Sequence, residues 1–181
     1  MVRFIGTYVA LAALFSGAVA SSLGSSAGVV VTDLNDLTKQ VVALNNSVNA
    51  YGVNPTYSNF LGIVYASSAV DDAVKKTTAS ASTPLSDADG QAVLQALQQS
   101  QPIFVTTLEN LASKEASFSK SNGLVLAIAK DLVLLTSDTA SLSVAVLTAI
   151  PCALRGGVGV VANAIRAAFV DALNAYVTTP E

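Results

Sequence analysis

Residues 124–150 carry apolar side chains on two sides of a predicted helix. One stripe follows steps of three and four residues and consists of Val125, Ile128, Leu132, Leu135, Leu142 and Val146. A second stripe beside it consists of Leu126, Val133 and Leu147. A helix that is apolar on two sides must be covered on two sides. We therefore expect this helix to lie at the centre of several others.

Three charged residues in the same stretch argue against a membrane span. Lys130, Asp131 and Asp138 would each cost about 2.5–3.5 kcal/mol at the centre of a bilayer. The sequence therefore predicts no transmembrane segment. The wide apolar surface of this helix either fills a core or holds something hydrophobic.

A helix preceding this stretch is predicted from a heptad seam. Its inward positions, spaced by three and four residues, are Leu34, Leu37, Val41, Leu44, Val48 and Tyr51. Thr32 is the expected N-cap, and Asp33 and Asp36 then lie in the first turn, where the helix dipole favours negative charge. Gly52 is expected to end this helix.

A second helix is predicted over residues 59–78. Its exposed face pairs Asp71 with Lys75 and Asp72 with Lys76, each four residues apart. The alternation of acid and base indicates a solvated face rather than a site.

Caps and breakers place the other helices. Ser86 opens a third helix with a variant capping box, and Pro102 is expected to kink or break it. Residues 119–123 form the turn into the central helix, and a last helix begins after the glycine-rich residues 155–159.

The first twenty residues have the three parts of a secretory signal peptide. Arg3 gives a positive start, residues 4–15 an apolar centre, and Ala18-Val19-Ala20 a small-residue cleavage site. The apolar run is short for a membrane helix. We expect residues 1–20 to be removed and residues 21–181 to form one domain, an all-α, single up-and-down bundle of about five helices.

The composition supports export and argues against nucleic acid as a partner. The chain is 52% hydrophobic but only 6% aromatic, which is typical of helix packing by Ala, Val and Leu. Charged residues make up 12%, which fits a secreted or cell-wall protein. The net charge of −3 offers no basic patch to a nucleic acid.

Two single residues bear on export. Cys152 is the one cysteine, so no internal disulfide forms; we expect a buried, inert thiol, with an intermolecular bridge as the alternative. Asn45, followed by Asn46 and Ser47, is a glycosylation acceptor if the secretory route is eukaryotic.

The sequence predicts no catalytic, metal or cofactor site. There is no histidine to act as a base, and the acidic pairs fall at predicted helix starts or on polar faces. No cluster of residues has the spacing of metal ligands. Residues 157–162 (GVGVVA) match a dinucleotide pattern but lack its preceding strand, so we interpret them as a glycine-rich segment that lets helices approach closely.

The apolar stripes leave two interpretations open. They fill a solid core, or they line a cavity or openable seam that holds an acyl chain, since ligand sites often lie between the helices of a bundle. A chain held there gains about 0.8 kcal/mol for each buried CH₂. The predicted lining is Leu37, Val41, Phe60, Val64, Leu97, Phe104, Leu108, Leu132, Leu135, Ile165 and Phe169.

Several stretches of the chain resemble one protein family. They are residues 34–52 (LNDLTKQVVALNNSVNAYG), 85–89 (LSDAD), 108–118 (LENLASKEASF), 150–151 (IP) and 167–176 (AAFVDALNAY). With the signal peptide, they are similar to the fungal hydrophobic surface-binding protein A family, which includes cell-wall galactomannoproteins.

The resemblance implies a secreted helical protein that is not an enzyme. Its expected partners are a fatty acid or other apolar ligand held inside the bundle, or a hydrophobic surface. One alternative is an adaptor that adsorbs to hydrophobic polymers and recruits an extracellular hydrolase such as a cutinase. Another is a structural cell-wall mannoprotein.

Overall fold

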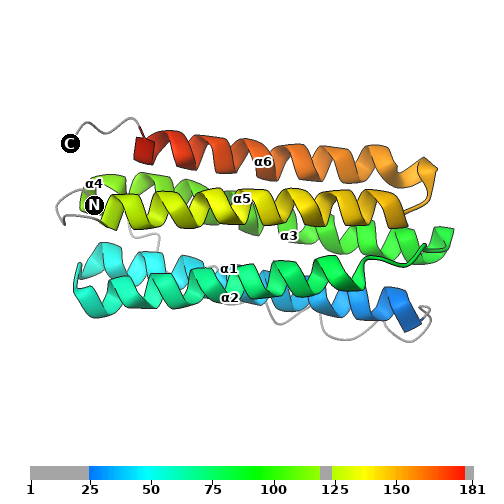
Figure 1. Cartoon of the computed structure of the whole chain (residues 1–181), viewed down its shortest axis with the longest axis horizontal. Helices are drawn as coiled ribbons and strands as arrows, with labels where there is room; N and C mark the ends of the chain where they lie inside the picture. The colour runs from blue at the N-terminus through cyan, green and yellow to red at the C-terminus, as the bar shows by residue number, and fades with distance from the viewer. Residues whose placement is uncertain (1–24, 119–123, 178–181) are drawn as a thin grey trace, which may run out of the picture.

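The computed structural model describes residues 25–118 and 124–177, which are almost entirely helical (Figure 1). The elements are α1 (Ser25–Val53), α2 (Tyr57–Ser80), α3 (Asp87–Ser113), α4 (Glu115–Phe118), α5 (Leu124–Ala149), a 3₁₀ turn η1 (Cys152–Leu154) and α6 (Arg155–Val177). The predicted all-α bundle with five long helices is confirmed. The predicted signal peptide and the turn at 119–123 lie outside the described residues.

The five long helices form a closed ring. Each packs mainly on two neighbours, in the order α1, α2, α5, α6, α3 and back to α1. Successive long helices run in opposite directions, so the chain is up-and-down, but the ring neighbours α2 and α5, α6 and α3, and α3 and α1 run parallel (Figure 1). Helices about 10 Å apart in a ring of five stand about 8.5 Å from its axis, farther than in a four-helix bundle. Side chains alone must fill that axis.

The first helix begins seven residues earlier than the sequence predicts. Thr32 is not an N-cap, because its hydroxyl donates to the carbonyl of Gly28 within α1, 2.8 Å away. Asp33 and Asp36 are therefore not in the first turn. The heptad seam continues upstream through Ala27 and Val30, both buried, and this packing outweighs the capping preference of threonine.

The cap of α3 is confirmed, whereas a break at Pro102 does not occur. Ser86 Oγ accepts from the backbone N–H of Asp89 at 3.2 Å and donates to the carboxylate of that residue at 2.8 Å. α3 continues through Pro102 to Ser113. Pro102 and Gln98 are exposed, so the carbonyl that proline leaves without a donor can bond to water.

The helix at residues 124–149 is covered on one side only, so the prediction of a central helix is wrong. Its inner face is buried in the ring, through Ile128, Leu132, Leu135, Leu142, Val146 and Ala149. On the opposite face Leu126, Val133 and Val144 are 59%, 56% and 63% exposed. A ring of five helices has side chains at its centre and no central helix. Leu126 and Val133 of the second apolar stripe therefore face outward, whereas Leu147 is half-buried against the core.

By length and composition alone, two stretches are apolar enough to cross a membrane: Leu124–Ala149 and Cys152–Val177. This is weak evidence, because core helices of soluble proteins pass the same test. In the fold both stretches bury one face in the ring.

Cys152 and the glycine-rich segment differ from expectation in detail. Cys152 is exposed in η1, so the expected buried thiol is wrong; the connection between α5 and α6 turns it outward at the bundle end. Residues 157–162 lie in regular helix. A Cβ on Gly157 would stand 2.8 Å from Leu94 Cδ2, so glycine here does let α6 approach α3 closely.

An aromatic cluster closes one end of the ring. The rings of Tyr51 and Phe118 stack with centroids 4.4 Å apart, and Tyr176 lies 6.2 Å from Phe118. The Tyr176 hydroxyl donates to the carbonyl of Leu111 at 2.8 Å, and burial raises the pKa of this tyrosine. The cluster joins α1, α3, α4 and α6.

Candidate functional site

Two cavities lie along the axis of the ring. The first is lined from all five long helices, by Val41, Leu44, Ile63, Ser67, Val70, Phe104, Thr107, Leu108, Leu111, Ile128, Asp131, Leu132, Leu135 and Phe169. The second is lined from α1, α3, α5 and α6, by Leu34, Leu37, Leu97, Ser100, Phe104, Thr139, Leu142, Ser143, Val146, Val158, Val161, Ala162 and Ile165.

Phe104 lines both cavities and therefore separates them. Its side chain is 5% exposed and projects from α3 into the axis. Each cavity measures about 30 Å³, room for about two water molecules. Neither holds an acyl chain as it stands. A longer ligand requires Phe104 to turn aside and the ring to widen.

The predicted lining residues are mostly brought together by the fold. Nine of the eleven line one cavity or the other: Leu37, Val41, Leu97, Phe104, Leu108, Leu132, Leu135, Ile165 and Phe169. Phe60 is buried and Val64 half-buried, and both lie outside the cavity walls, toward the turn between α1 and α2. That the nine contact a ligand stays a prediction.

Sequence reasoning missed the polar residues of the walls. Thr107 and Ser100 donate their hydroxyl protons to carbonyls of their own helix, at 2.8 Å each. Asp131 on α5 and Ser67 on α2 instead line the first cavity together; burial raises the pKa of Asp131, and the nearby Ser67 hydroxyl opposes that rise. The signal was present, because Asp131 lies three residues after Ile128 and four before Leu135, on the inner stripe.

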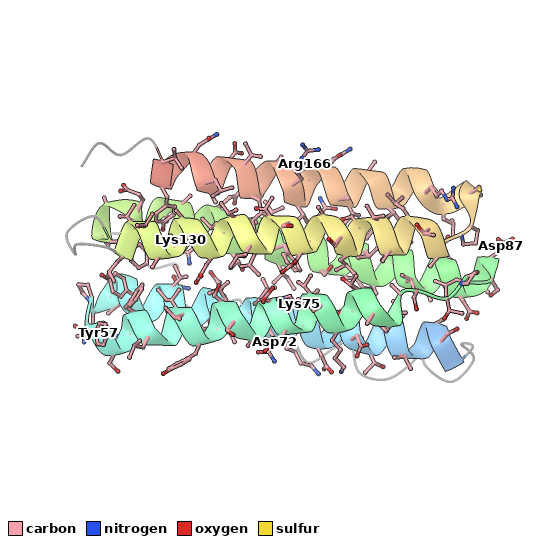
Figure 2. All side chains as sticks on the ribbon, in the orientation of Figure 1. Tyr57, Asp72, Lys75, Asp87, Lys130 and Arg166 are labelled. Carbon is pink, nitrogen blue, oxygen red and sulfur yellow. The ribbon has the colours of Figure 1, made fainter. Side chains whose placement is uncertain are left out.

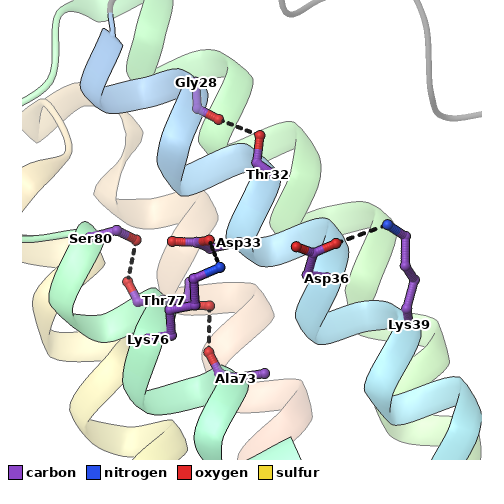
Figure 3. Close-up of polar contacts among 9 residues, drawn as sticks. All are labelled: Gly28, Thr32, Asp33, Asp36, Lys39, Ala73, Lys76, Thr77 and Ser80. Atoms are coloured by element: carbon purple, nitrogen blue, oxygen red, sulfur yellow. Dashed lines mark hydrogen bonds and ion pairs between the residues drawn. The ribbon is translucent and has the colours of Figure 1, made fainter.

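An ion pair joins α1 to α2 near the second cavity. Lys76 Nζ lies 2.8 Å from Asp33 Oδ1, whose side chain is almost fully buried (Figure 3). Instead of the predicted pair with Asp72, which lies on the side of α2 away from α5 (Figure 2), Lys76 thus pairs across the seam with α1. The predicted pair of Lys75 with Asp71 is confirmed, at 2.6 Å.

The seam between α2 and α5 is rich in carboxyl groups. Asp71 and Asp138 lie within hydrogen-bonding reach of each other, and Lys75 Nζ lies 3.6 Å from Asp138 Oδ2. The hydrogen bonds with Asp138 and Lys75 lower the pKa of Asp71, whereas Asp71 and burial raise the pKa of Asp138. Asp71 Oδ1 is buried and accepts no hydrogen bond. A donor on the neighbouring side chain of Asp138 would therefore satisfy it.

Replacing Asp138 with asparagine should stabilise the protein at pH 7. The raised pKa means that ionised Asp138 costs stability above its unfolded value of about 3.8, and that this cost disappears as the pH falls. The new amide can also donate to Asp71 Oδ1. We expect a gain of about 1 kcal/mol or less at pH 7 that shrinks toward pH 4, measured by urea unfolding. Asp72→Asn is the control, and a loss of stability at pH 7 contradicts the argument.

The described residues bring no metal-type cluster together: within 25–118 and 124–177, no three His, Cys, Asp or Glu side chains gather as ligands would.

The amide of Asn45 is already engaged, since its Oδ1 accepts from Asn110 Nδ2 on α3 at 2.8 Å. Glycosylation of Asn45 stays a prediction.

Comparison with known proteins identifies the family. The sequence model described as hydrophobic surface binding protein A matches residues 27–148, which include α2, α3 and α4 and nearly all of α1 and α5. The chain belongs to the hydrophobic surface binding protein A family. The resemblance seen in the sequence is thereby confirmed. This is a family of binding proteins, named for contact with hydrophobic surfaces.

Two solved structures share the fold of this family member. AfMP4p, crystallised with palmitic acid, is 24% identical with a TM-score of 0.78, over 83% of this chain and 99% of that one. Ligand-binding domain 1 of the Penicillium marneffei MP1 protein, complexed with arachidonic acids, is 18% identical with a TM-score of 0.76, over 83% of this chain and 98% of that domain. A comparison with curated proteins gave no match.

Proposed function

We propose that this protein binds the acyl chain of a fatty acid along the axis of its ring. The observation that carries the proposal is the apolar axis formed by two cavities with Phe104 between them. The structures of AfMP4p with palmitic acid and of the MP1 domain with arachidonic acids support it, because they share this fold.

The axis offers enough length and apolar surface for such a ligand. Along α5 the lining runs from Ile128 to Val146, about 27 Å at the rise of an α-helix. Each methylene buried there contributes about 0.8 kcal/mol, so a dozen contribute roughly 10 kcal/mol toward widening the ring and immobilising the chain. The walls consist mainly of aliphatic side chains and contain no tryptophan, so the helices that carry them can move apart with few large aromatic rings left unpacked.

Lipid extraction tests the proposal. Purified protein is denatured in organic solvent and the extract is analysed by mass spectrometry, before and after incubation with palmitic acid. We expect a fatty acid at up to one or a few molecules per chain, and a higher melting temperature after loading. A protein that yields no lipid and cannot be loaded overturns the proposal.

We propose in addition that the outer face of α5 adsorbs to hydrophobic surfaces. Leu126, Val133 and Val144 are separated by seven and eleven residues, which are two and three helical turns, so they form one straight line along the helix. All three are more than half exposed. This line, the α5 stripe, belongs to no cavity wall and therefore acts independently of the axis.

Replacing the α5 stripe with glutamine should abolish adsorption. Leu126→Gln, Val133→Gln and Val144→Gln together remove roughly 1 kcal/mol or more each of apolar contact, so depletion by hydrophobic beads should fall at least about tenfold. The control replaces Val29, Val53 and Tyr57 on α1 and α2, which are also more than half exposed. Equal depletion of the two variants shows that adsorption uses another face.

We propose that the protein acts outside the cell, after removal of residues 1–20. The three parts of a signal peptide occur in the required order in the sequence and support this, as does membership of the family. N-terminal sequencing of protein from the culture medium should begin near Ser21.

Recruitment of an extracellular hydrolase remains the alternative role of the adsorbed protein. A hydrolase assay on hydrophobic beads, with and without a coat of this protein, shows whether the protein recruits the enzyme.

A further inference from the structure

One carboxyl group interrupts the apolar wall of the first cavity. Apart from Thr107, whose hydroxyl bonds to its own helix, the polar lining consists of Asp131 on α5 and Ser67 on α2. Ser67 is 6% exposed and Asp131 half-buried, and the Ser67 hydroxyl is close enough to Asp131 to oppose the rise in its pKa. A carboxylate lining an apolar cavity is costly to bury, and Ser67 alone does not use all its acceptor capacity.

The surroundings of Asp131 are acidic. Asp71 on the facing helix α2 raises its pKa further, after burial, and Asp138 lies two turns along α5. Lys75, the cation of this seam, is bound to Asp71. Lys130 on α5 is exposed, and the charged residues of α6, which packs on the other side, are also exposed: Arg155, Arg166 and Asp171. Lys130 and Arg166 are labelled in Figure 2.

We propose that Asp131 and Ser67 form the polar anchor of the first cavity, and that this anchor favours long-chain ligands whose head group donates a hydrogen bond, such as an alcohol, over those that carry an ionised carboxylate. The inference rests on the proposed function, because it assigns the end at which an axial chain is held.

The selectivity follows from donors and charges. A carboxylate only accepts hydrogen bonds, so Asp131 binds a hydroxyl head group through a charge-assisted bond. An ionised fatty-acid head group at the same place offers no donor and puts a second negative charge beside Asp131, in a wall of low dielectric. A fatty acid is therefore held with its carboxylate away from Asp131, or as the neutral acid.

The test compares two ligands of equal chain length on full-length protein. Dissociation constants of hexadecanol and palmitate are measured at pH 7.5 for wild type, Asp131→Asn, Ser67→Ala and Asp72→Asn. The ratio of the two constants is compared between variants, because this cancels the solubility of each ligand. Asp72→Asn is a matched control, since it removes the same charge from an exposed site on α2.

We expect Asp131→Asn to shift the ratio toward palmitate by about tenfold or more, because the amide donates to a carboxylate and removes the repulsion. Ser67→Ala should shift the ratio by less and toward hexadecanol, because it removes a neighbouring donor from Asp131, and Asp72→Asn should leave it within about twofold. Circular dichroism confirms that each variant is folded.

The outcomes separate this inference from the proposed function. Tight binding of both ligands with the same ratio in wild type and Asp131→Asn overturns the anchor and leaves the acyl-binding function standing. Equal shifts in Asp131→Asn and Asp72→Asn also overturn it, because the effect is then one of overall charge. Failure of wild type to bind either ligand overturns both.

Discussion

Replacing Phe104 with alanine should destabilise the protein and at the same time increase its capacity for acyl ligands. The ring of Phe104 is buried and lies between the two cavities, so its removal joins them into one axial slot. Truncation of a buried phenylalanine costs about 3–5 kcal/mol in proteins where the site cannot collapse. The bound chain then occupies the vacated volume and recovers part of this loss.

The measurement is a pair of melting curves, without and with palmitic acid. For Phe104→Ala the ligand should raise the melting temperature by several degrees more than for wild type. Two contributions to the free energy of unfolding add together: that of ligand binding, and that of filling the space left by the phenylalanine ring. Loading by mass spectrometry should also extend to longer chains.

Phe60→Ala provides a matched control for this prediction. Phe60 is equally buried, yet it lies outside both cavity walls. Its removal should cost a similar free energy of unfolding without any gain in ligand response. An equal ligand response in the two variants shows that Phe104 is an ordinary core residue and that the axis is not where the ligand lies.

Replacing Phe118 with alanine should cost about 3–5 kcal/mol of unfolding free energy. Phe118 is fully buried and lies between the rings of Tyr51 and Tyr176, so its loss removes the aromatic ring that both of them contact. Such ring pairs contribute about 0.5–1.5 kcal/mol each beyond the area they bury. The short α4 has no other buried residue, and we expect it to detach from the bundle.

Tyr176→Phe separates the hydroxyl from the ring in this cluster. The carbonyl of Leu111 also accepts from the backbone N–H of Lys114 at 3.1 Å, so it keeps one partner when the hydroxyl is removed. The cost should be only about 1 kcal/mol, measured by urea unfolding alongside Phe118→Ala. A Phe118→Ala variant no less stable than Tyr176→Phe contradicts the role given to the stacked rings.

The inward faces of the helices were predictable because helical periodicity is a local property. Leu37 and Val41, or Leu132 and Leu135, share a face whatever lies opposite, and their burial follows from spacing alone. Thr32 shows the limit of local rules. A capping preference of about 1 kcal/mol cannot hold the start of a helix when upstream apolar residues have a core to enter.

The order of helices around the ring was not predictable, and several errors follow from that. Spacing shows that α5 is apolar on two sides, but only the ring shows that Val133 faces outward and Leu132 inward. The pairing of Lys76 with Asp33 and the exposure of Cys152 likewise depend on neighbours distant in the chain. Phe104 was predicted as lining, yet its position between two cavities depends on all five helices at once.

The place of α6 in the ring has a consequence for biosynthesis. α6 follows the other four long helices of the ring in the chain, lies outside the matched residues 27–148, and stands between α3 and α5, which precede it. Since domains fold from the N-terminal side as they emerge from the ribosome, the ring lacks one of its five long helices until α6 has been synthesised. Until then the apolar inner face of the other helices is exposed to water, to chaperones and to any lipid nearby.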